Sequence, residues 1–388
     1  MNRLETGHRV LFVIESAFPT PGSGGAEAQV QLLARELRAR DLLVQVVSPR
    51  VSYNDQAEHE LVDGVPLWRI KYPYVRLVGG LVLLSKLAWY LIWERHRYDV
   101  IHAHIAHNMA AVACIAGKLV GKPVVVKLTG WLEMQRGILS DHITGPTGYL
   151  RRWAIRQATY YQATSNEIAG LLEQHGFARD KIVYLPNAVD LSRFKIDGKS
   201  FQEGSGVGTR PLTGVFVGRL VPEKSLDVLI KAWGQAFTPD APVRLVIVGD
   251  GPLRESLESQ VKQAKLDHQI EFVGRSEEVP RYLAEADFGL LPSTFEGLSN
   301  TLLEYLSAGL PVIGSRISGT EDFVVTGETG WLFEAGNETA LAGCLRQVSS
   351  TSSHRRREMG QASRARVMEQ AGIERVVDRL LDLYGLAN

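Results

Sequence analysis

Short apolar runs alternate with longer amphipathic segments along the whole chain, and this alternation constrains the fold more than any other feature. In the first half the runs cover residues 10–14, 43–47, 99–102, 124–128, 161–163 and 182–185. In the second half they cover residues 214–217, 245–248, 270–273, 288–291 and 312–313. Runs that are apolar at successive positions predict strands buried on both faces, and the helices between them predict parallel sheets covered on two sides.

The two series of runs are separated by residues 195–210, which are rich in Gly, Ser and Lys and have no apolar periodicity. Such a stretch is typical of a linker. We therefore expect an N-terminal domain over residues 1–194 and a second domain over residues 211–365, each about the size of one doubly wound α/β domain. Residues 366–388 have helical spacing and predict a C-terminal helix. The sequence leaves open whether this helix crosses back to the first domain.

Charge and cysteine content exclude several classes of protein. The 43 basic residues equal the 43 acidic ones, which argues against a protein that binds nucleic acid through bulk basicity. Two cysteines far apart in the chain, Cys114 and Cys344, exclude a disulfide scaffold and a zinc ribbon and favour a reducing compartment. The apolar run at residues 10–14 is too short for a signal peptide. We therefore expect a cytoplasmic protein with no nucleic-acid partner.

One segment of the first domain indicates contact with a membrane surface. Residues 77–93 form the most apolar window, but Lys86 interrupts it, and it is shorter than the roughly 20 residues of a membrane-spanning helix. The window contains Trp89 and Trp93, and residues 1–190 carry 21 basic against 17 acidic residues. A helix of this kind suits an anionic bilayer surface, so we expect peripheral attachment at the inner face of the membrane through the N-terminal domain. An ordinary helix packed on the sheet is the alternative.

A glycine-rich loop follows the first predicted strand. Gly24 and Gly25 stand directly before a helical segment, where the absence of side chains lets backbone amides approach a phosphate. The spacing is not that of the dinucleotide fingerprint, and a flexible turn is the alternative.

The second domain places two cations after its first predicted strand. Arg219 follows Gly218 directly, and Lys224 stands just before the next helical segment. A guanidinium group binds phosphate oxygens as a fork, and an ammonium group binds them as a point charge. Taken alone, two such residues are usually solvated side chains of the surface.

Two glutamates flank a predicted helix start after the run at residues 288–291. Glu296 lies in the loop, Ser299 is a good N-cap, and Glu304 lies about one turn into the helix. Backbone amides at residues 298–301 therefore predict an anion site. Carboxylates beside an anion site need hydrogen-bond donors. Sugar hydroxyls are suitable donors, and each of the two carboxylates would bind one sugar ring. A capped surface helix with two solvated glutamates is the alternative.

Five motifs occur in an order that resembles glycosyltransferase family 4. They lie at residues 24–27, 186–190, 218–224, 249–252 and 296–304. The resemblance implies a retaining, nucleotide-sugar-dependent enzyme of GT-B fold, with two Rossmann-like doubly wound domains that face each other across a cleft. It implies that residues 1–194 bind the acceptor and that residues 211–365 bind the nucleotide-sugar.

The same resemblance implies individual roles in the donor site. Arg219 and Lys224 look like the pair that binds the diphosphate, and the loop with Gly24 and Gly25 lets that diphosphate approach. Glu296 looks like the residue that holds the hydroxyls of the donor sugar, and Glu304 like the one that holds the ribose. The catalytic residues are then Glu296, Arg219 and Lys224, and the remaining donor contacts are Gly274 and Arg275 for the base, with Gly297, Leu298, Ser299 and Asn300 at the helix start.

On the acceptor side the sequence departs from the common pattern of the family. Thr129 stands where many members carry a histidine, which puts any mechanism with an imidazole there in doubt. Of the nearby His102, His104 and His107, we expect His104 to line the cleft. Three imidazoles at this spacing need not converge on a metal ion, and no DxD motif is present. We therefore expect no metal and no cofactor, since the nucleotide-sugar is a substrate.

The expected function is transfer of a sugar from a UDP- or GDP-sugar to a saccharide, lipid-linked or small-molecule acceptor, in glycan or glycolipid biosynthesis. Two alternatives stay open. A nucleotide-sugar 2-epimerase on the same fold would turn over without an acceptor. A non-catalytic GT-B partner subunit would usually have lost the phosphate-binding cations or the paired glutamates, all of which this sequence retains.

Overall fold

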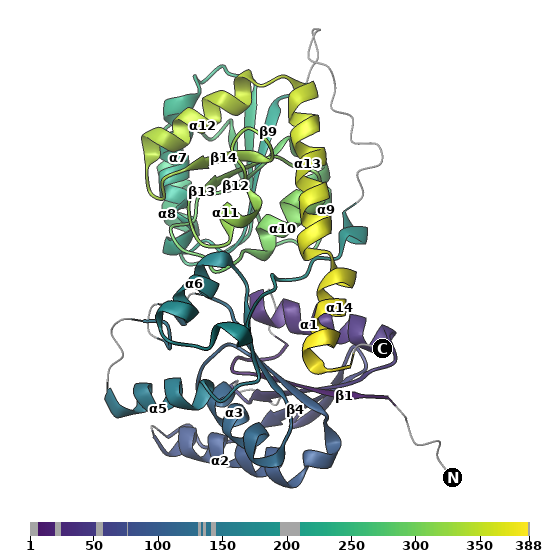
Figure 1. Ribbon diagram of the computed structural model, residues 1–388. Helices are drawn as coiled ribbons and strands as arrows, with labels where there is room; N and C mark the ends of the chain where they lie inside the picture. The colour runs from purple at the N-terminus through teal and green to yellow at the C-terminus, as the bar shows by residue number, and fades with distance from the viewer. Residues whose placement is uncertain are drawn as a thin grey trace. The chain divides into compact units, whose positions relative to one another are not determined.

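The computed structural model describes residues 7–19, 25–51, 57–75, 77–130, 133–134, 137–140, 145–194 and 210–386. The chain divides into two compact units (Figure 1). Unit 1 comprises Met1–Ala188 together with Ile373–Asn388, and unit 2 comprises Val189–Gly372. Every predicted apolar run overlaps a strand of one of these units, so the α/β class predicted from the runs is confirmed.

The first unit ends at Ala188 rather than at residue 194. The reason is that the backbone amide of Val189 donates to the carbonyl of Ala371 at 2.9 Å, and that Val189 and Phe194 are buried in the core of unit 2. Of the predicted linker at residues 195–210, only Arg210 lies within the described residues.

The end of the chain forms two helices where the spacing predicts one. Helix α13 (Ser353–Ala371) is part of unit 2, Gly372 interrupts it, and helix α14 (Ile373–Tyr384) is part of unit 1. Val376, Val377 and Leu380 of α14 are buried in the unit 1 core.

Unit 1 is built on an eight-stranded sheet with the order β3-β4-β2-β1-β5-β6-β7-β8. Neighbouring strands are parallel except for β3 and β4. Because β1 lies between β2 and β5, the strand order changes direction there, and ligands bind at the carboxyl ends of strands at such a point. The strands are β1 (Arg9–Ile14), β2 (Leu43–Pro49), β3 (His59–Val62), β4 (Val65–Ile70), β5 (Val100–His104), β6 (Val124–Leu128), β7 (Tyr160–Ala163) and β8 (Ile182–Tyr184).

Helices cover both faces of this sheet because successive strand residues point to opposite sides. Leu11 and Val13 of β1 belong to one core, and Val10 and Phe12 belong to the other. The first core is covered by α2 (Val78–Trp93), α3 (Asn108–Val120), α5 (Gly145–Ile155) and α6 (Asn166–Gln174), and the second by α1 (Gly25–Ala39) and α14, as Figure 1 shows.

Two strands of unit 1 were not predicted from the apolar runs. Strands β3 and β4 form a hairpin through Asp63 and Gly64, which have φ values of 51° and 76°. A two-residue turn with positive φ at both positions favours an Asp-Gly sequence. The dipeptide was therefore a readable signal for this hairpin.

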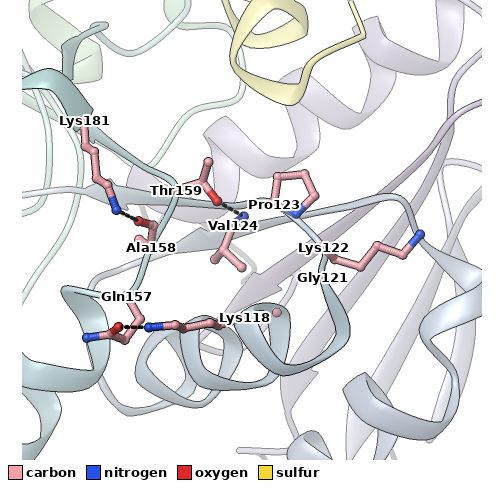
Figure 2. Close-up of a pocket in the computed structure, with 10 residues that line it drawn as sticks. Lys118, Gly121, Lys122, Pro123, Val124, Gln157, Ala158, Thr159 and Lys181 are labelled. Carbon is pink, nitrogen blue, oxygen red and sulfur yellow. Dashed lines mark hydrogen bonds between the residues drawn. The ribbon is translucent and has the colours of Figure 1, made fainter.

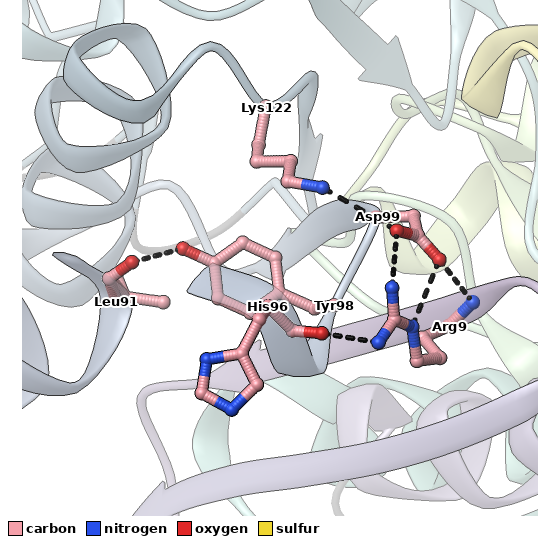
Figure 3. A network of polar contacts seen from close by, with 6 residues as sticks. All are labelled: Arg9, Leu91, His96, Tyr98, Asp99 and Lys122. Carbon is pink, nitrogen blue, oxygen red and sulfur yellow. Dashed lines mark hydrogen bonds and ion pairs between the residues drawn. The ribbon is translucent and has the colours of Figure 1, made fainter. Parts of the chain in front are cut away.

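A polar network joins three segments at the amino-terminal edge of the same sheet (Figure 3). Asp99, just before β5, accepts hydrogen bonds from Arg9 of β1 at 2.9–3.1 Å and pairs with Lys122, just before β6, at 3.4 Å. Burial opposes ionisation of Asp99, but the hydrogen bonds and charge of Arg9 outweigh it and hold the pKa of Asp99 near 2. The hydroxyl of Tyr98 donates to the carbonyl of Leu91 and so fixes the last turn of α2.

Unit 2 has a six-stranded parallel sheet with the order β11-β10-β9-β12-β13-β14. Its strand order changes direction at β9, which lies between β10 and β12, so the carboxyl ends of β9 and β12 form the expected ligand edge. The strands are β9 (Leu212–Val217), β10 (Val243–Val248), β11 (Ile270–Gly274), β12 (Phe288–Leu291), β13 (Val312–Ser315) and β14 (Gly330–Phe333). The helices are α7 (Leu226–Ala236), α8 (Arg254–Gln263), α9 (Val279–Glu285), α10 (Asn300–Ser307), α11 (Thr320–Phe323) and α12 (Glu338–Ser350), together with α13.

Candidate active site

Two glycine turns place Arg219 at the carboxyl end of β9. A Cβ on Gly249 would lie 1.8 Å from the carbonyl oxygen of Gly218, and a Cβ on Gly251 would lie 2.5 Å from that of Leu220. The turns after β9 and β10 thus pack backbone against backbone, which only glycine allows. Arg219 itself is exposed, and its guanidinium group makes no hydrogen bond or ion pair with any described residue. It is a free cation at the ligand edge of unit 2.

Lys224 and Glu296 form an ion pair, although 72 residues separate them in the sequence. Lys224 ends the short turn Pro222–Lys224, and Glu296 lies in the loop after β12. The hydroxyl of Ser293 donates to the same carboxylate oxygen at 3.0 Å, and the amide of Thr294 donates to the carbonyl of Glu223 at 2.9 Å. The two loops are therefore held together by a charge pair and a backbone hydrogen bond.

Glu304 lies on α10, close to the same edge, in a different environment. No described residue donates a hydrogen bond to its carboxyl group. Burial raises the pKa of Glu304 to about 7, and the charge of Arg193 opposes that rise. At neutral pH this carboxyl group therefore titrates, so the two glutamates of the motif are chemically distinct.

The start of α10 differs in one respect from the sequence prediction. Ser299 occupies the N-cap position and is buried, but its side chain accepts no hydrogen bond from the first turn. Gly297 and Leu298 pack against Gly319, whose φ is 74° and whose Cβ, if present, would lie 2.3 Å from the carbonyl oxygen of Gly297. Gly319 was not predicted to shape the site, since its contact comes from a different loop. Asn300 begins the helix as expected.

Tyr305 is a second residue that the sequence did not reveal. Its hydroxyl accepts a hydrogen bond from the amide of Val217 at 2.7 Å, and so anchors α10 to the end of β9. The ring lies over Gly289, where a Cβ would come within 2.5 Å of it. A glycine in the middle of a buried strand was the available signal, because it often marks such a close approach.

The residues predicted to hold the base lie at the end of β11. Gly274 has a φ of 84°, its carbonyl accepts a hydrogen bond from the amide of Gly249 at 2.8 Å, and Arg275 after it is exposed. These contacts connect the turn after β11 to the turn that supports Arg219.

In unit 1, Glu133 organises the end of β6. Its carboxylate is fully buried and accepts hydrogen bonds from the amides of Ala106, Thr129 and Gly130 and from the Thr129 hydroxyl, at 3.0–3.2 Å. The hydroxyl of Thr129 is therefore engaged in positioning Glu133. Of the predicted glycine pair, Gly24 lies outside the described residues and Gly25 begins α1.

His104 does not line an open surface as expected. It is 1% exposed, and its ring stacks on His102 at a centroid distance of 4.3 Å. Burial and the neighbouring charges of His102 and Lys127 push the pKa of His104 far below its usual range. The correction follows from strand alternation, because His102 and His104 both point into the core that α1 and α14 cover.

A buried lysine stands beside these histidines. Lys127 pairs with His104 across β5 and β6 and with Gln162 across β6 and β7. Its ammonium group has no hydrogen-bond partner among the described residues, and burial lowers the pKa of Lys127 to about 7.

His107 lies apart from this cluster, and its side chain is more exposed to solvent than that of His104. It contacts Glu15 at 2.8 Å through Nδ1 and Arg151 at 2.8 Å through Nε2. The described residues contain no group of three or more His, Cys, Asp or Glu side chains arranged to hold a metal ion.

Both halves of the chain match glycosyltransferase families. Residues 23–193 match the model of Glycosyltransferase Family 4, and residues 211–351 match the model of Glycosyl transferases group 1.

Similar proteins include the N-acetyl-alpha-D-glucosaminyl L-malate synthase of Bacillus anthracis, which is 26% identical over 78% of each chain. The UDP-Gal:alpha-D-GlcNAc-diphosphoundecaprenol alpha-1,3-galactosyltransferase of Escherichia coli is 26% identical over 77% of this chain and 78% of that protein. Among solved structures, Anabaena Alr3699/HepE in complex with UDP superposes with a TM-score of 0.75 at 20% identity, over 97% of this chain and 99% of that one.

Proposed function

The chain belongs to family 4 of the glycosyltransferases and has their GT-B fold, and on that basis we propose that its donor is a UDP- or GDP-sugar. We propose further that the anomeric configuration is retained. The acceptor is a saccharide, a lipid-linked glycan or a small molecule, and the reaction serves glycan or glycolipid biosynthesis. The names of relatives support these choices, since one is a galactosyltransferase for a diphosphoundecaprenol-linked sugar and another is a synthase of N-acetyl-glucosaminyl L-malate.

The observation that carries the proposal is the set of charges at one edge of unit 2. Arg219, the Lys224–Glu296 pair and Glu304 all follow β9 or β12, the two strands at which the order changes direction. Departure of a nucleoside diphosphate leaves negative charge on a phosphate oxygen and positive charge on the sugar. Cations and carboxylates at these two places lower the barrier because they stabilise the charges that develop on the phosphate and on the sugar.

Each side chain then has a distinct task. Arg219 is exposed and has no partner in the part of the chain that the structure describes, so it binds the diphosphate without first giving up a contact there. Lys224 is already paired, so an arriving phosphate competes with Glu296 for its ammonium group. The carboxylate of Glu296 is thereby released to accept hydrogen bonds from the donor sugar, whose ring gains positive charge in the transition state.

A retaining route needs no dedicated general base, and none is assigned among the described residues of the site. In this route the acceptor attacks from the side on which the diphosphate leaves, and the departing phosphate oxygen takes its proton. Position 129 then does not require a basic residue such as histidine. The hydrogen bond from Thr129 to Glu133 fixes the shape of the acceptor side. Protein cations neutralise the leaving group, so we propose that no metal ion is required.

A thermal-shift panel of UDP- and GDP-sugars tests the donor site. One nucleotide class should raise Tm by mass action, and the shift should be lost in Arg219→Ala and retained in Arg281→Ala, which removes an exposed arginine on α9. If no nucleotide-sugar shifts Tm, the donor proposal is wrong.

Product analysis then tests the reaction. An NMR spectrum of the product should show the same anomeric configuration as the donor, and inversion would overturn the retaining mechanism. Conversion of the donor to an epimer without any acceptor would identify a 2-epimerase instead. Donor binding without any turnover would identify a non-catalytic subunit.

Unit 1 also supports the predicted location of the enzyme. We propose a cytoplasmic enzyme that attaches peripherally to the inner face of the membrane through unit 1, where lipid-linked acceptors are accessible. None of the helices in the described residues has the length and apolar character needed to cross a bilayer.

A further inference from the structure

Exposed large apolar side chains are distributed very unevenly over the described residues. Unit 2 exposes Met368, and every other such side chain belongs to unit 1. Most of these lie on α2 and the segment before it, on α3 and on α5. Soluble surfaces rarely gather so many apolar side chains in one region, and such a gathering indicates an interaction site.

The three helices form one layer. Helix α3 packs against α2 on one side and against α5 on the other, and the buried faces of all three belong to the same core (Figure 1). Their outward faces therefore belong to one surface of unit 1, which we call the α2–α3–α5 surface. The hydrogen bond from Tyr98 to Leu91 holds the end of α2 in place (Figure 3).

Aromatic side chains recur at the same spacing on the two outer helices. Trp89 and Trp93 lie one turn apart on α2, with their rings stacked at 6.1 Å, and they are 54% and 60% exposed. Tyr149 and Trp153 lie one turn apart on α5 and are 63% and 55% exposed. Trp and Tyr favour the boundary between lipid headgroups and acyl chains, where one end of the ring is apolar and the other is wet.

The charges of this surface have one sign. Helices α2, α3 and α5 contain no Asp or Glu, and their exposed cations are Lys86 and Lys118. Arg151 and Arg152 are partly buried and contact His107 and the carbonyl of Ile138, respectively. The helices of the opposite face, α1 and α14, contain acidic residues alongside arginines. Exposed aromatic side chains beside the exposed Lys86 and Lys118 complement an anionic bilayer, whereas a second copy of the same surface would bring like charges together.

A lysine-lined cavity adjoins the end of α3 (Figure 2). It has a volume of about 480 Å³, and Lys118, Lys122 and Lys181 are among its lining residues. Lys122 is paired with Asp99, whereas Lys118 and Lys181 donate to the uncharged oxygens of Gln157 and Ala158. Leu119, next to Lys118, is 72% exposed. An apolar side chain beside a basic cavity suits a phosphate headgroup whose acyl chain lies against the protein.

We propose that the α2–α3–α5 surface binds an anionic lipid bilayer, with its aromatic pairs at the headgroup–acyl boundary and its lysines on headgroup phosphates. This inference names the surface and the lipid chemistry for the peripheral attachment proposed above. It rests on the proposed function only for the reason why the enzyme would attach to a membrane. Both outer helices lie on the bilayer, so attachment through α2 alone is insufficient.

Vesicle flotation of the full chain tests the proposal. The protein should float with phosphatidylcholine vesicles that contain phosphatidylglycerol, should float poorly with phosphatidylcholine alone, and should be released by high salt. The double substitutions Trp89→Gln with Trp93→Gln, and Tyr149→Gln with Trp153→Gln, should each lower the partition coefficient about 10-fold or more. Met368→Gln, which removes an exposed apolar side chain from unit 2, is the matched control and should float like the unaltered chain.

Charge is tested in the same way. Lys86→Gln with Lys118→Gln should weaken flotation, and Lys231→Gln with Lys262→Gln, two exposed lysines of unit 2, should not. The proposal is overturned if the unaltered chain does not float, if the controls lose as much as the surface variants, or if only the α2 variants lose binding. It is also overturned if light scattering shows a dimer that the tryptophan variants dissociate, because a second copy is then the occupant.

The donor thermal shift, measured on the same variants, separates this proposal from the proposed function. Variants that lose vesicle binding but keep the donor shift support both. Vesicle binding without any donor shift leaves the surface standing and removes the donor assignment.

Discussion

Replacing Glu304 by glutamine should change how the stability of unit 2 depends on pH. The carboxyl group has a pKa of about 7 in the folded chain because it is buried, against a usual 4.5. Below pH 4.5 it is protonated in both the folded and the unfolded state, so it contributes no difference. Between pH 4.5 and pH 7 only the unfolded chain loses the proton, and the folded state becomes steadily less stable as pH rises.

The magnitude follows from that difference. A shift of about 2.5 pKa units corresponds to about 3 kcal/mol at 1.36 kcal/mol for each unit. Most of this loss falls between pH 5 and pH 8, where it amounts to about 2.5 kcal/mol. Glutamine cannot ionise and has nearly the same shape, so Glu304→Gln should lack this loss and should be more stable than the unaltered chain at pH 8.

Urea unfolding at several pH values measures the effect. Hydrogen exchange of peptides from residues 243–333 reports on unit 2 alone. This separation is needed because urea unfolding of the whole chain also includes the unfolding of unit 1. The difference between the unaltered chain and Glu304→Gln should grow from pH 5 to pH 8. The control is Glu255→Gln, an exposed carboxyl group on α8, which should leave the pH dependence unchanged.

Donor binding should depend on the same ionisation if Glu304 accepts hydrogen bonds from the ribose. A group with a pKa of about 7 goes from about 10% to about 90% ionised between pH 6 and pH 8, so nucleotide-sugar affinity should rise about 10-fold. A nucleotide-sugar is the right probe because its diphosphate does not titrate in this range. Parallel stability curves for the unaltered chain and Glu304→Gln would refute the reasoning, since the buried carboxyl group would then not be the perturbed one.

Three further predictions follow from the same structure. Glu296→Gln should lower kcat by about 100-fold, or about 2.7 kcal/mol, in steady-state assays, because the carboxylate acts on the reacting sugar. Affinity for the free nucleoside diphosphate should rise, since its phosphate no longer competes with Glu296 for Lys224; a loss of that affinity equal to the loss in kcat would contradict this role. Lys127→Met should raise the stability of unit 1 by at least about 1 kcal/mol in urea unfolding at pH 7, because burial disfavours the ammonium form. This gain should shrink toward pH 10, where the unfolded lysine also loses its charge, and a gain constant with pH would rule out ionisation as the cause. Activity should survive EDTA in a product assay, and a complete loss restored by Mg²⁺ or Mn²⁺ would show that Arg219 and Lys224 do not replace a metal ion.

The sequence by itself determined the architecture and named the residues of the candidate site. Apolar runs of strand length between helical segments predict parallel sheets, because each run must be buried on both faces wherever it lies. The glycines after β9 and β10 and the glutamates around α10 were also readable, since a turn or a helix start depends on residues close together in the chain. Even the missed hairpin β3–β4 had a local signal in Asp63 and Gly64.

The tertiary structure alone decided which of these side chains meet and which are buried. Lys224 and Glu296 were predicted to bind different parts of the donor, yet they form a pair because β9 and β12 are neighbours in the sheet. Strand alternation and the return of α14 placed His104 inside the core, where its ring is buried with Lys127. Contacts of this kind join residues far apart in the sequence, and their charge states depend on burial, which a local pattern of residues does not contain.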